Sequence, residues 1–188
     1  MKILYNKSLA FVALTLLFSG ACKKEDPVIP NEEEIITTLI YTLTPDSGGV
    51  PVELTFRDLD GDGGNAPIIT DGYLNANKNY SGTLMLLNEI ETPAGDISKE
   101  IKDEDLAHQF FFMTAVGLDL AISYDDQDSE GNPVGLTTHV TTGNVSQGQL
   151  TIVLRHKPDK SATGVAEGNI TNAGGETDIE VSFGVYIQ

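Results

Sequence analysis

Alternation of apolar and polar residues at every second position is the feature that most constrains how this chain can fold. In the segment 52–57, the side chains of Val52, Leu54 and Phe56 are apolar and those between them are polar. The same pattern recurs in the segments 118–124, 134–141, 150–156 and 177–187. Because successive side chains of a strand point to opposite faces, this pattern predicts antiparallel strands with one buried face.

Three further runs are apolar on both faces, at 35–44, 82–90 and 108–116. Burial of both faces predicts central strands, or strands that a loop covers. In the last run Phe110 and Phe112 fall on one face and Phe111 on the other. We expect these rings to fill the core, and the alternative is that at least one is exposed as a contact.

Helical spacing is rare in the sequence, and only the segment 96–107 departs from the strand pattern. Ile97 and Ile101 lie four residues apart there among charged residues. Clusters of Gly, Pro, Asn and Asp separate the strand-like segments. The chain is therefore predicted to be an all-β, antiparallel β-sandwich (Ig-like) of about eight strands, with one short helical or irregular crossover near 96–107.

The N-terminus has the layout of an export signal. Lys2 and Lys7 precede an apolar run at 9–18 and then small residues before Cys22. The sequence "SGAC" resembles the lipobox of bacterial lipoproteins, which implies cleavage before Cys22 and lipidation of that cysteine. We therefore expect a signal peptide at 1–21, a flexible acidic tether at 22–34 and a single β-sandwich domain at 35–188.

The residues "KKED" after Cys22 are similar to the signals that follow the cysteine in surface lipoproteins of the Bacteroidota. The resemblance implies an outer-membrane lipoprotein that faces the periplasm or the cell surface. The acyl chains would provide the membrane contact, so the folded part needs no membrane-binding face of its own.

The formal net charge is −17 at pH 7, and loss of Lys2 and Lys7 with the signal peptide makes it more negative. Such a surface repels nucleic acid, which excludes it as a partner, and it leaves cations, cationic partners or simple solubility as explanations. The segment 155–160, "RHKPDK", is a basic cluster in this acidic chain. We expect it to form a solvated turn with a compensating acid, and binding of an anion or an acidic partner is the alternative.

The first acidic loop, "DLDGDGGN", carries Asp58, Asp60 and Asp62 at alternate positions, followed by Gly63. Alternate carboxylates can converge on one Ca²⁺ ion, and a glycine allows the sharp bend that such loops need. An EF-hand would require glutamate at its twelfth position, where this chain has Ile69, and helices rather than strands on both sides. The loop is therefore predicted to be a structural Ca²⁺ site that other side chains complete.

A second loop, "YDDQDSEGNP", repeats the spacing with Asp126, Asp128 and Glu130. The segment 103–154 contains no lysine or arginine, so no base nearby in sequence can neutralise these acids. Like charges about 4 Å apart repel by roughly 1 kcal/mol even in water, so the carboxylates either turn outward into solvent or share a divalent ion. This loop is predicted as a second structural Ca²⁺ site, with an ordinary acidic turn as the alternative.

The three histidines, His108, His139 and His156, show no metal-ligand spacing in the sequence. A zinc or copper site would require the fold to bring them together with an acid. We expect instead that they lie on the surface or form single hydrogen bonds.

Motifs for catalysis are absent from the sequence: there is no phosphate-binding loop, dinucleotide fingerprint, nucleophile-elbow serine or zinc-protease helix. The chain also has no tryptophan to stack on sugar rings beside paired acids. We therefore expect a protein that is not an enzyme.

Segments across the body of the chain, among them "LTFRDLDGDGGNAPIIT", "HQFFF", "GNPVGLTTHVTTG", "LRHKPDKSATGV" and "ITNAGGETDIEVSF", resemble a group of small Bacteroidota lipoproteins with an acidic tether and one all-β domain. Some members carry the label "type 1 periplasmic binding fold". The strand pattern of this chain contradicts that label, because the fold needs two α/β lobes.

Taken together, these features predict a non-enzymatic envelope lipoprotein, a binding or accessory module beside an outer-membrane receptor or another envelope protein, with Ca²⁺ stabilising its acidic loops. Two alternatives stay open. One is a metal-handling lipoprotein for zinc, copper or iron that works with an outer-membrane receptor. The other is a purely structural surface protein.

Overall fold

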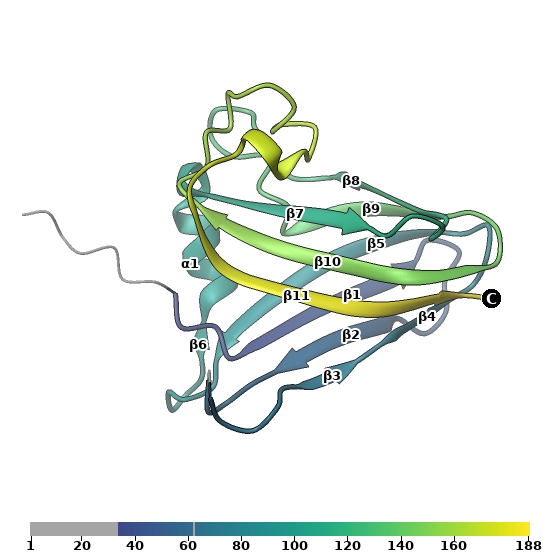
Figure 1. The fold of residues 1–188 in the computed structure, drawn as a ribbon, viewed down its shortest axis with the longest axis horizontal. Helices are drawn as coiled ribbons and strands as arrows, with labels where there is room; N and C mark the ends of the chain where they lie inside the picture. The colour runs from purple at the N-terminus through teal and green to yellow at the C-terminus, as the bar shows by residue number, and fades with distance from the viewer. Residues whose placement is uncertain (1–33, 62) are drawn as a thin grey trace, which may run out of the picture. The chain divides into compact units, whose positions relative to one another are not determined.

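A computed structural model describes residues 34–61 and 63–188. The predicted signal peptide, Cys22 and nearly all of the predicted tether lie outside these residues, as does Asp62. Figure 1 shows two layers of strands, with a short helix at one end of them. The predicted all-β sandwich is confirmed. In the described part of the chain, no helix is long and apolar enough to cross a membrane.

The larger layer is a seven-stranded sheet in the order β3-β2-β1-β5-β9-β8, with β6 pairing on β5. Its strands are β1 (Thr38–Pro45), β2 (Val52–Arg57), β3 (Ile68–Thr70), β5 (Asn79–Asn88), β6 (Gly95–Asp96), β8 (Leu120–Tyr124) and β9 (Thr137–Thr142). All of its strand pairs are antiparallel. The segment 35–44 was predicted to be central, and β1 is indeed paired on both sides.

The smaller layer has four strands in the order β4-β11-β10-β7. Its strands are β4 (Gly72–Leu74), β7 (His108–Thr114), β10 (Ser146–His156) and β11 (Glu176–Ile187). The pairing of β4 with β11 is parallel, a departure from the purely antiparallel prediction. Very short strands such as β3, β4 and β6 account for the difference from about eight predicted strands, because three or fewer residues carry no readable alternation.

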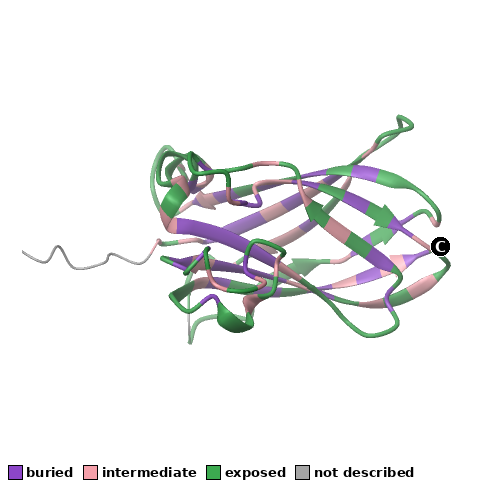
Figure 2. Ribbon diagram, turned by 90° about the horizontal axis from the view of Figure 1, so that it is seen from above, coloured by how far each residue is buried: buried purple, intermediate pink, exposed green. Residues whose placement is uncertain are grey.

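The core lies between the two sheets and follows the predicted alternation. Along β5, buried and exposed residues alternate almost without a break. Figure 2 shows changes between buried, intermediate and exposed residues along the strands. The predicted central position of this segment is confirmed, since β5 pairs with β1 and β9. The predicted burial of both its faces is wrong for one face, because Met85 is half exposed. The largest fully buried side chains include Tyr41, Tyr80, Phe110 and Phe183.

A second, smaller core explains the both-face burial of β7. This strand lies at the edge of its sheet, and the loop 157–175, which includes the 3-10 turn η2 (Ile170–Asn172), covers its outer face. Phe111 packs there with Val153, Val165 and Ala173, all of them buried. The predicted core filling by Phe110 and Phe111 is confirmed, and Phe112 packs against the main core.

The predicted crossover consists of helix α1 (Ile97–Asp103) and the 3-10 turn η1 (Asp105–Ala107). Asp96 caps the helix, since its carboxylate accepts a hydrogen bond of 3.1 Å from the backbone N–H of Lys99. Ile97 and Ile101 are buried and join the main core, which holds the helix against β5. The helix leads directly to β7 and thereby positions the first residue of that strand.

Candidate metal centre

Two histidines lie side by side at the end of the smaller sheet. His108 is the first residue of β7 and His156 the last residue of β10, and the two are cross-strand partners. Both belong to the inward-facing rows that carry Phe110 on β7 and Leu154 on β10. Their ring centroids are 4.7 Å apart, and both residues are buried. A surface position, one of the two predicted alternatives, is therefore wrong for these two and right for His139, which is exposed near Asp46. The other alternative, a hydrogen bond, is confirmed for His108, whose Nδ1 bonds to the backbone carbonyl of Glu104.

Asp178 faces both imidazoles because of an irregularity in β11. Leu154 pairs with Ile179 and Arg155 pairs with Thr177, so Asp178 is an extra residue in the ladder. Such a β-bulge redirects a side chain. The carboxylate of Asp178 is fully buried, with Oδ2 at 3.9 Å from Nε2 of His108 and Oδ1 at 3.8 Å from Nδ1 of His156.

The hydrogen bonding of His108 fixes which of its nitrogens carries a proton. Nδ1 lies 3.2 Å from the backbone carbonyl oxygen of Glu104, which can only accept, so Nδ1 donates. Burial lowers the pKa of His108, and the nearby His156 lowers it further, so the ring is neutral. Nε2 then presents a lone pair, and among the described residues this buried atom has no hydrogen-bond partner.

Two glutamates extend the group toward solvent. Glu34, at the end of the predicted tether, and Glu104, at the C-terminal end of α1, form a second set of nearby ligand atoms with His108. Burial raises the pKa of Glu34 to about 7, and repulsion from Glu100, Glu104 and Asp178 contributes to this rise. An ionised Glu34 is therefore costly in the metal-free protein.

We call His108, His156, Asp178, Glu34 and Glu104 the histidine–carboxylate cluster. In each of its two triads, one ligand atom per residue lies within 4.8 Å of the others, and His108 belongs to both. A tetrahedral zinc site with bonds of about 2.0–2.1 Å places its donor atoms about 3.4 Å apart. The distances of 3.8 and 3.9 Å around Asp178 therefore need to shorten by only about half an ångström.

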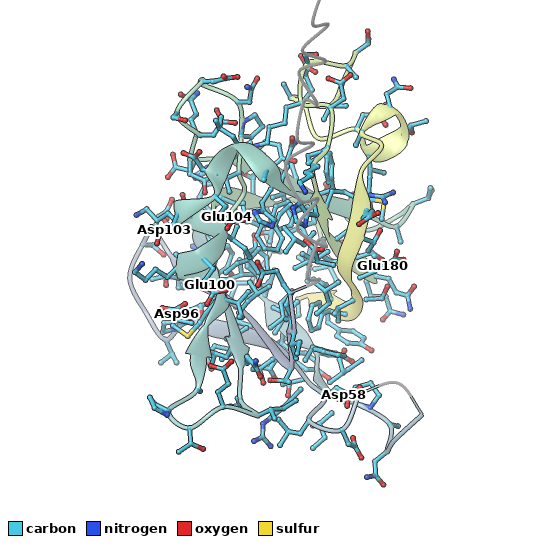
Figure 3. All side chains as sticks on the ribbon, turned by 90° about the vertical axis from the view of Figure 1, so that its left-hand side faces the viewer. Asp58, Asp96, Glu100, Asp103, Glu104 and Glu180 are labelled. Carbon is cyan, nitrogen blue, oxygen red and sulfur yellow. The ribbon has the colours of Figure 1, made fainter. Side chains whose placement is uncertain are left out.

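The outer surface at this end of the sandwich is acidic. Figure 3 views the molecule from that end and shows Glu100 and Glu104 on α1 and its C-terminal cap, with Asp96 and Asp103 beside them. Lys99 pairs with Asp103, and Lys102 lies in the last turn of the same helix, so the three remaining carboxylates of this group outnumber the one remaining base. Clustered negative charge raises the local concentration of cations.

The first predicted Ca²⁺ loop uses its carboxylates within the loop. Oδ1 of Asp58 accepts from the backbone N–H of Gly61 at 2.9 Å, and Oδ2 of Asp60 accepts from the backbone and side chain of Asn65 at 3.0 and 2.7 Å. The backbone N–H of Asn65 lowers the pKa of Asp60, and its side chain adds to this effect. These are the hydrogen bonds of an acidic turn.

The second predicted loop is held by groups that are distant in sequence. Asp126 accepts backbone hydrogen bonds from Gly135 at 2.7 Å, Leu136 at 2.7 Å and Thr137 at 3.0 Å. Burial alone would raise the pKa of Asp128, but Lys160 and two backbone N–H groups outweigh it and hold this pKa below its usual range. Nζ of Lys160 lies 2.9 Å from Oδ2 of Asp128, and both side chains are buried.

Lys160 is thus the base that the second loop lacks in its own part of the sequence, and it comes from the basic segment 155–160. Glu130 is exposed. Within the described residues, the groups of three metal-ligating side chains contain none of Asp58, Asp60, Asp126, Asp128 or Glu130. Ca²⁺ binding by these loops stays a prediction, and the contacts above give their carboxylates another structural role.

Comparison with known proteins gives no further information about the function of this site. A scan against protein-family models and searches of curated proteins and of solved structures found no match.

Proposed function

We propose that this protein is an envelope lipoprotein whose folded domain binds a divalent transition-metal ion, Zn²⁺ in the first instance, at the histidine–carboxylate cluster. The observation that carries the proposal is the arrangement of His108 and Asp178. Nε2 of the neutral His108 ring, which has no hydrogen-bond partner among the described residues, lies 3.9 Å from Oδ2 of Asp178, so two atoms that can ligate a metal lie close together in a buried place.

A cation between these two atoms offsets their repulsion. The carbonyl of Glu104 orients His108 from behind, as the outer partners of metal-binding histidines do. A dication would also stabilise the ionised form of Glu34, whose pKa is raised by burial and by its acidic neighbours. The cluster is thus arranged to gain from a positive charge at its centre.

The donor types favour a transition metal over calcium. Ca²⁺ and Mg²⁺ take oxygen ligands, whereas imidazole nitrogen suits Zn²⁺, Cu²⁺ and Fe²⁺. Two imidazoles and one carboxylate, with further carboxylates within reach, can complete a four-coordinate zinc site. The same set also suits Fe²⁺, which makes that ion the principal competitor.

The proposed role is binding and handling of the metal rather than catalysis. The side chains of His108, His156 and Asp178 are almost completely buried, which leaves little room for a substrate beside them. The acidic end of the sandwich would draw cations toward the cluster from the envelope. The proposed partners are the membrane, through a lipid on Cys22, and an outer-membrane receptor or another envelope protein that supplies or accepts the metal.

The test is calorimetric titration of the chelator-stripped protein with Zn²⁺, Cu²⁺, Fe²⁺ and Ca²⁺, each in a separate experiment. The Fe²⁺ titration is done under anaerobic conditions. We expect Zn²⁺ to bind with a Kd below about 1 µM, which corresponds to about −8 kcal/mol. His108→Ala and His156→Ala should each weaken binding at least about tenfold, a loss of about 1.4 kcal/mol. His139→Ala is the matched control, because His139 is exposed and outside the cluster.

Equal binding by all three histidine variants would refute the proposal, as would an equal loss in the His139→Ala control. Binding of Ca²⁺ alone, with an affinity that the histidine variants do not change, would make the acidic loops the favoured metal-binding sites. Thermal unfolding of each variant without metal, beside the wild type, shows that a loss of binding does not reflect a loss of folding.

A further inference from the structure

A groove separate from the histidine–carboxylate cluster opens beside the free edge of the larger sheet. Its volume is about 710 Å³, within the range of roughly 300–1,000 Å³ that is usual for small-molecule sites. The edge strand β8, the loop 125–133 and the segment 166–168 line it, and Phe112 of β7 contributes from the other sheet. The proposed metal centre does not use this groove, whereas Asp126 of the second predicted Ca²⁺ loop lies in its wall.

The groove combines aromatic rings with negative charge. Phe112 and Tyr124 meet edge to face, with centroids 6.2 Å apart and an interplanar angle of 61°, so they form a corner. Asp125, Asp126 and Glu167 add three carboxylates, and the described lining residues include no lysine, arginine or histidine. Asp125 and Glu167 are exposed, and no described ion pair neutralises them.

The walls of the groove are fixed before any ligand binds. The hydroxyl of Tyr124 donates a hydrogen bond of 2.7 Å to the carbonyl of Phe110, which holds the ring in place. The three backbone hydrogen bonds accepted by Asp126 fix one wall. The buried pair of Asp128 and Lys160 ties the loop 125–133 to the segment 157–168 on the opposite side. A preformed wall reduces the entropic cost of binding.

From these observations we infer that the groove is a binding site for a small organic ammonium compound. Aromatic faces attract ammonium groups within about 6 Å of the ring centroid, and neighbouring carboxylates supply the opposite charge. A bare divalent metal fits less well, because Phe112 and Tyr124 offer it no strong ligand. The charge and shape of the groove therefore select a cation that carries an apolar body.

The test is two-dimensional NMR of the whole protein titrated with choline and, in parallel, with 3,3-dimethylbutan-1-ol, its uncharged isostere. A third titration uses Nα-acetyl-lysine amide, which represents a lysine side chain of another protein. We expect choline to shift the amide signals of Tyr124, Asp125 and Glu167 with a Kd below about 1 mM, equivalent to about −4 kcal/mol. The isostere should bind at least about tenfold more weakly.

Two variants and one control locate the site. Phe112→Leu removes an aromatic face at similar size, and Glu167→Gln removes one charge, so each should raise the Kd for choline by about three- to tenfold. Glu53→Gln changes an exposed acid on β2, far from the groove in the sheet order, and should leave the Kd unchanged. His108→Ala should also leave it unchanged, which separates this inference from the metal proposal.

Equal binding of choline and the uncharged isostere would overturn the inference. So would shifts spread over all acidic surfaces, or a loss in the Glu53→Gln control equal to that in Glu167→Gln. Binding of the lysine amide without choline would keep the ammonium site and overturn the assignment of a free small molecule as its source.

Discussion

His156, the last residue of β10, is the cross-strand partner of His108, the first residue of β7, and their rings lie 4.7 Å apart. Both side chains continue rows of residues that otherwise fill the apolar core. The apolar core therefore ends in a layer of polar side chains. Asp178, on the neighbouring strand β11, completes this layer. Among the described residues, Nε2 of His108 has no hydrogen-bond partner in this layer, and an unsatisfied buried polar group costs about 1–3 kcal/mol.

Asp178→Asn should weaken Zn²⁺ binding at least about tenfold, or about 1.4 kcal/mol, because the amide keeps the shape of the side chain but loses its charge. Calorimetric titration checks this. Glu180→Gln is the control, since Glu180 lies on the same strand and is exposed. If both variants lose affinity equally, general electrostatic attraction explains the binding better than coordination by Asp178.

The contribution of Glu34 to the stability of the metal-free protein should fall as pH rises from about 4.5 to about 7, because the pKa of Glu34 is about 7 in the folded state and 4.5 in the unfolded chain. Across that interval the folded state holds the proton and the unfolded state has lost it, so each rise in pH favours unfolding. Thermal unfolding in a chelating buffer at a series of pH values measures the effect of Glu34.

Glu34→Gln isolates this contribution, because glutamine cannot ionise. At pH 8 the metal-free variant should melt at a higher temperature than the wild type, whereas at pH 4 the two should be similar. With saturating Zn²⁺ the order should reverse, because the ionised glutamate then faces a dication. An unchanged melting temperature in all three conditions would show that Glu34 does not interact with the cluster.

Lys160→Met should destabilise the protein by about 3–5 kcal/mol, because it leaves the buried carboxylate of Asp128 without its cation. Nζ of Lys160 also donates to the carbonyl groups of Asp105 and Pro133 at 2.8 and 3.1 Å, so the variant loses three contacts together. Urea unfolding at pH 7 measures the loss. The double variant with Asp128→Asn should recover part of it, and no recovery would mean that the charge pair matters less than the carbonyl contacts.

Phe111→Ala should remove the anchor of the loop 157–175 at a cost of about 3–5 kcal/mol, the usual range for a buried phenylalanine. Hydrogen exchange should then rise in this loop before it rises in β10 or β11, since the small core holds only the outer face of its sheet. Val116→Ala is the control, because that side chain is fully exposed and should change stability by less than about 0.5 kcal/mol.

The strands and their buried faces could be predicted from the sequence because a period of two is a local signal. The same period of two also indicated the positions of two histidines, and the prediction did not use this information. His156 is two residues beyond Leu154 and His108 two before Phe110, so strict alternation places both on the buried face. The prediction relied instead on their spacing in the chain, which says nothing about neighbours on paired strands.

Other parts of the site could not be predicted from local patterns. Pairing of β7 with β10 depends on the fold of the whole domain, and the bulge at Asp178 reverses the direction that alternation predicts for this side chain. Likewise, Lys160 reaches the second acidic loop only through tertiary packing. The acids that the prediction singled out form turns, whereas the acids of the cluster come from three separate parts of the chain and meet only in the folded domain.

The bulge at Asp178 has a consequence for how such a site arises and disappears in evolution. Because the carboxylate enters the cluster as one extra residue in an otherwise regular ladder, a deletion of a single codon would remove the ligand and straighten the strand in the same event. The two histidines would remain as cross-strand neighbours. One deletion can therefore remove the proposed ligand Asp178, and one insertion can restore it while both histidines are kept, so proteins with this architecture can differ in this one feature.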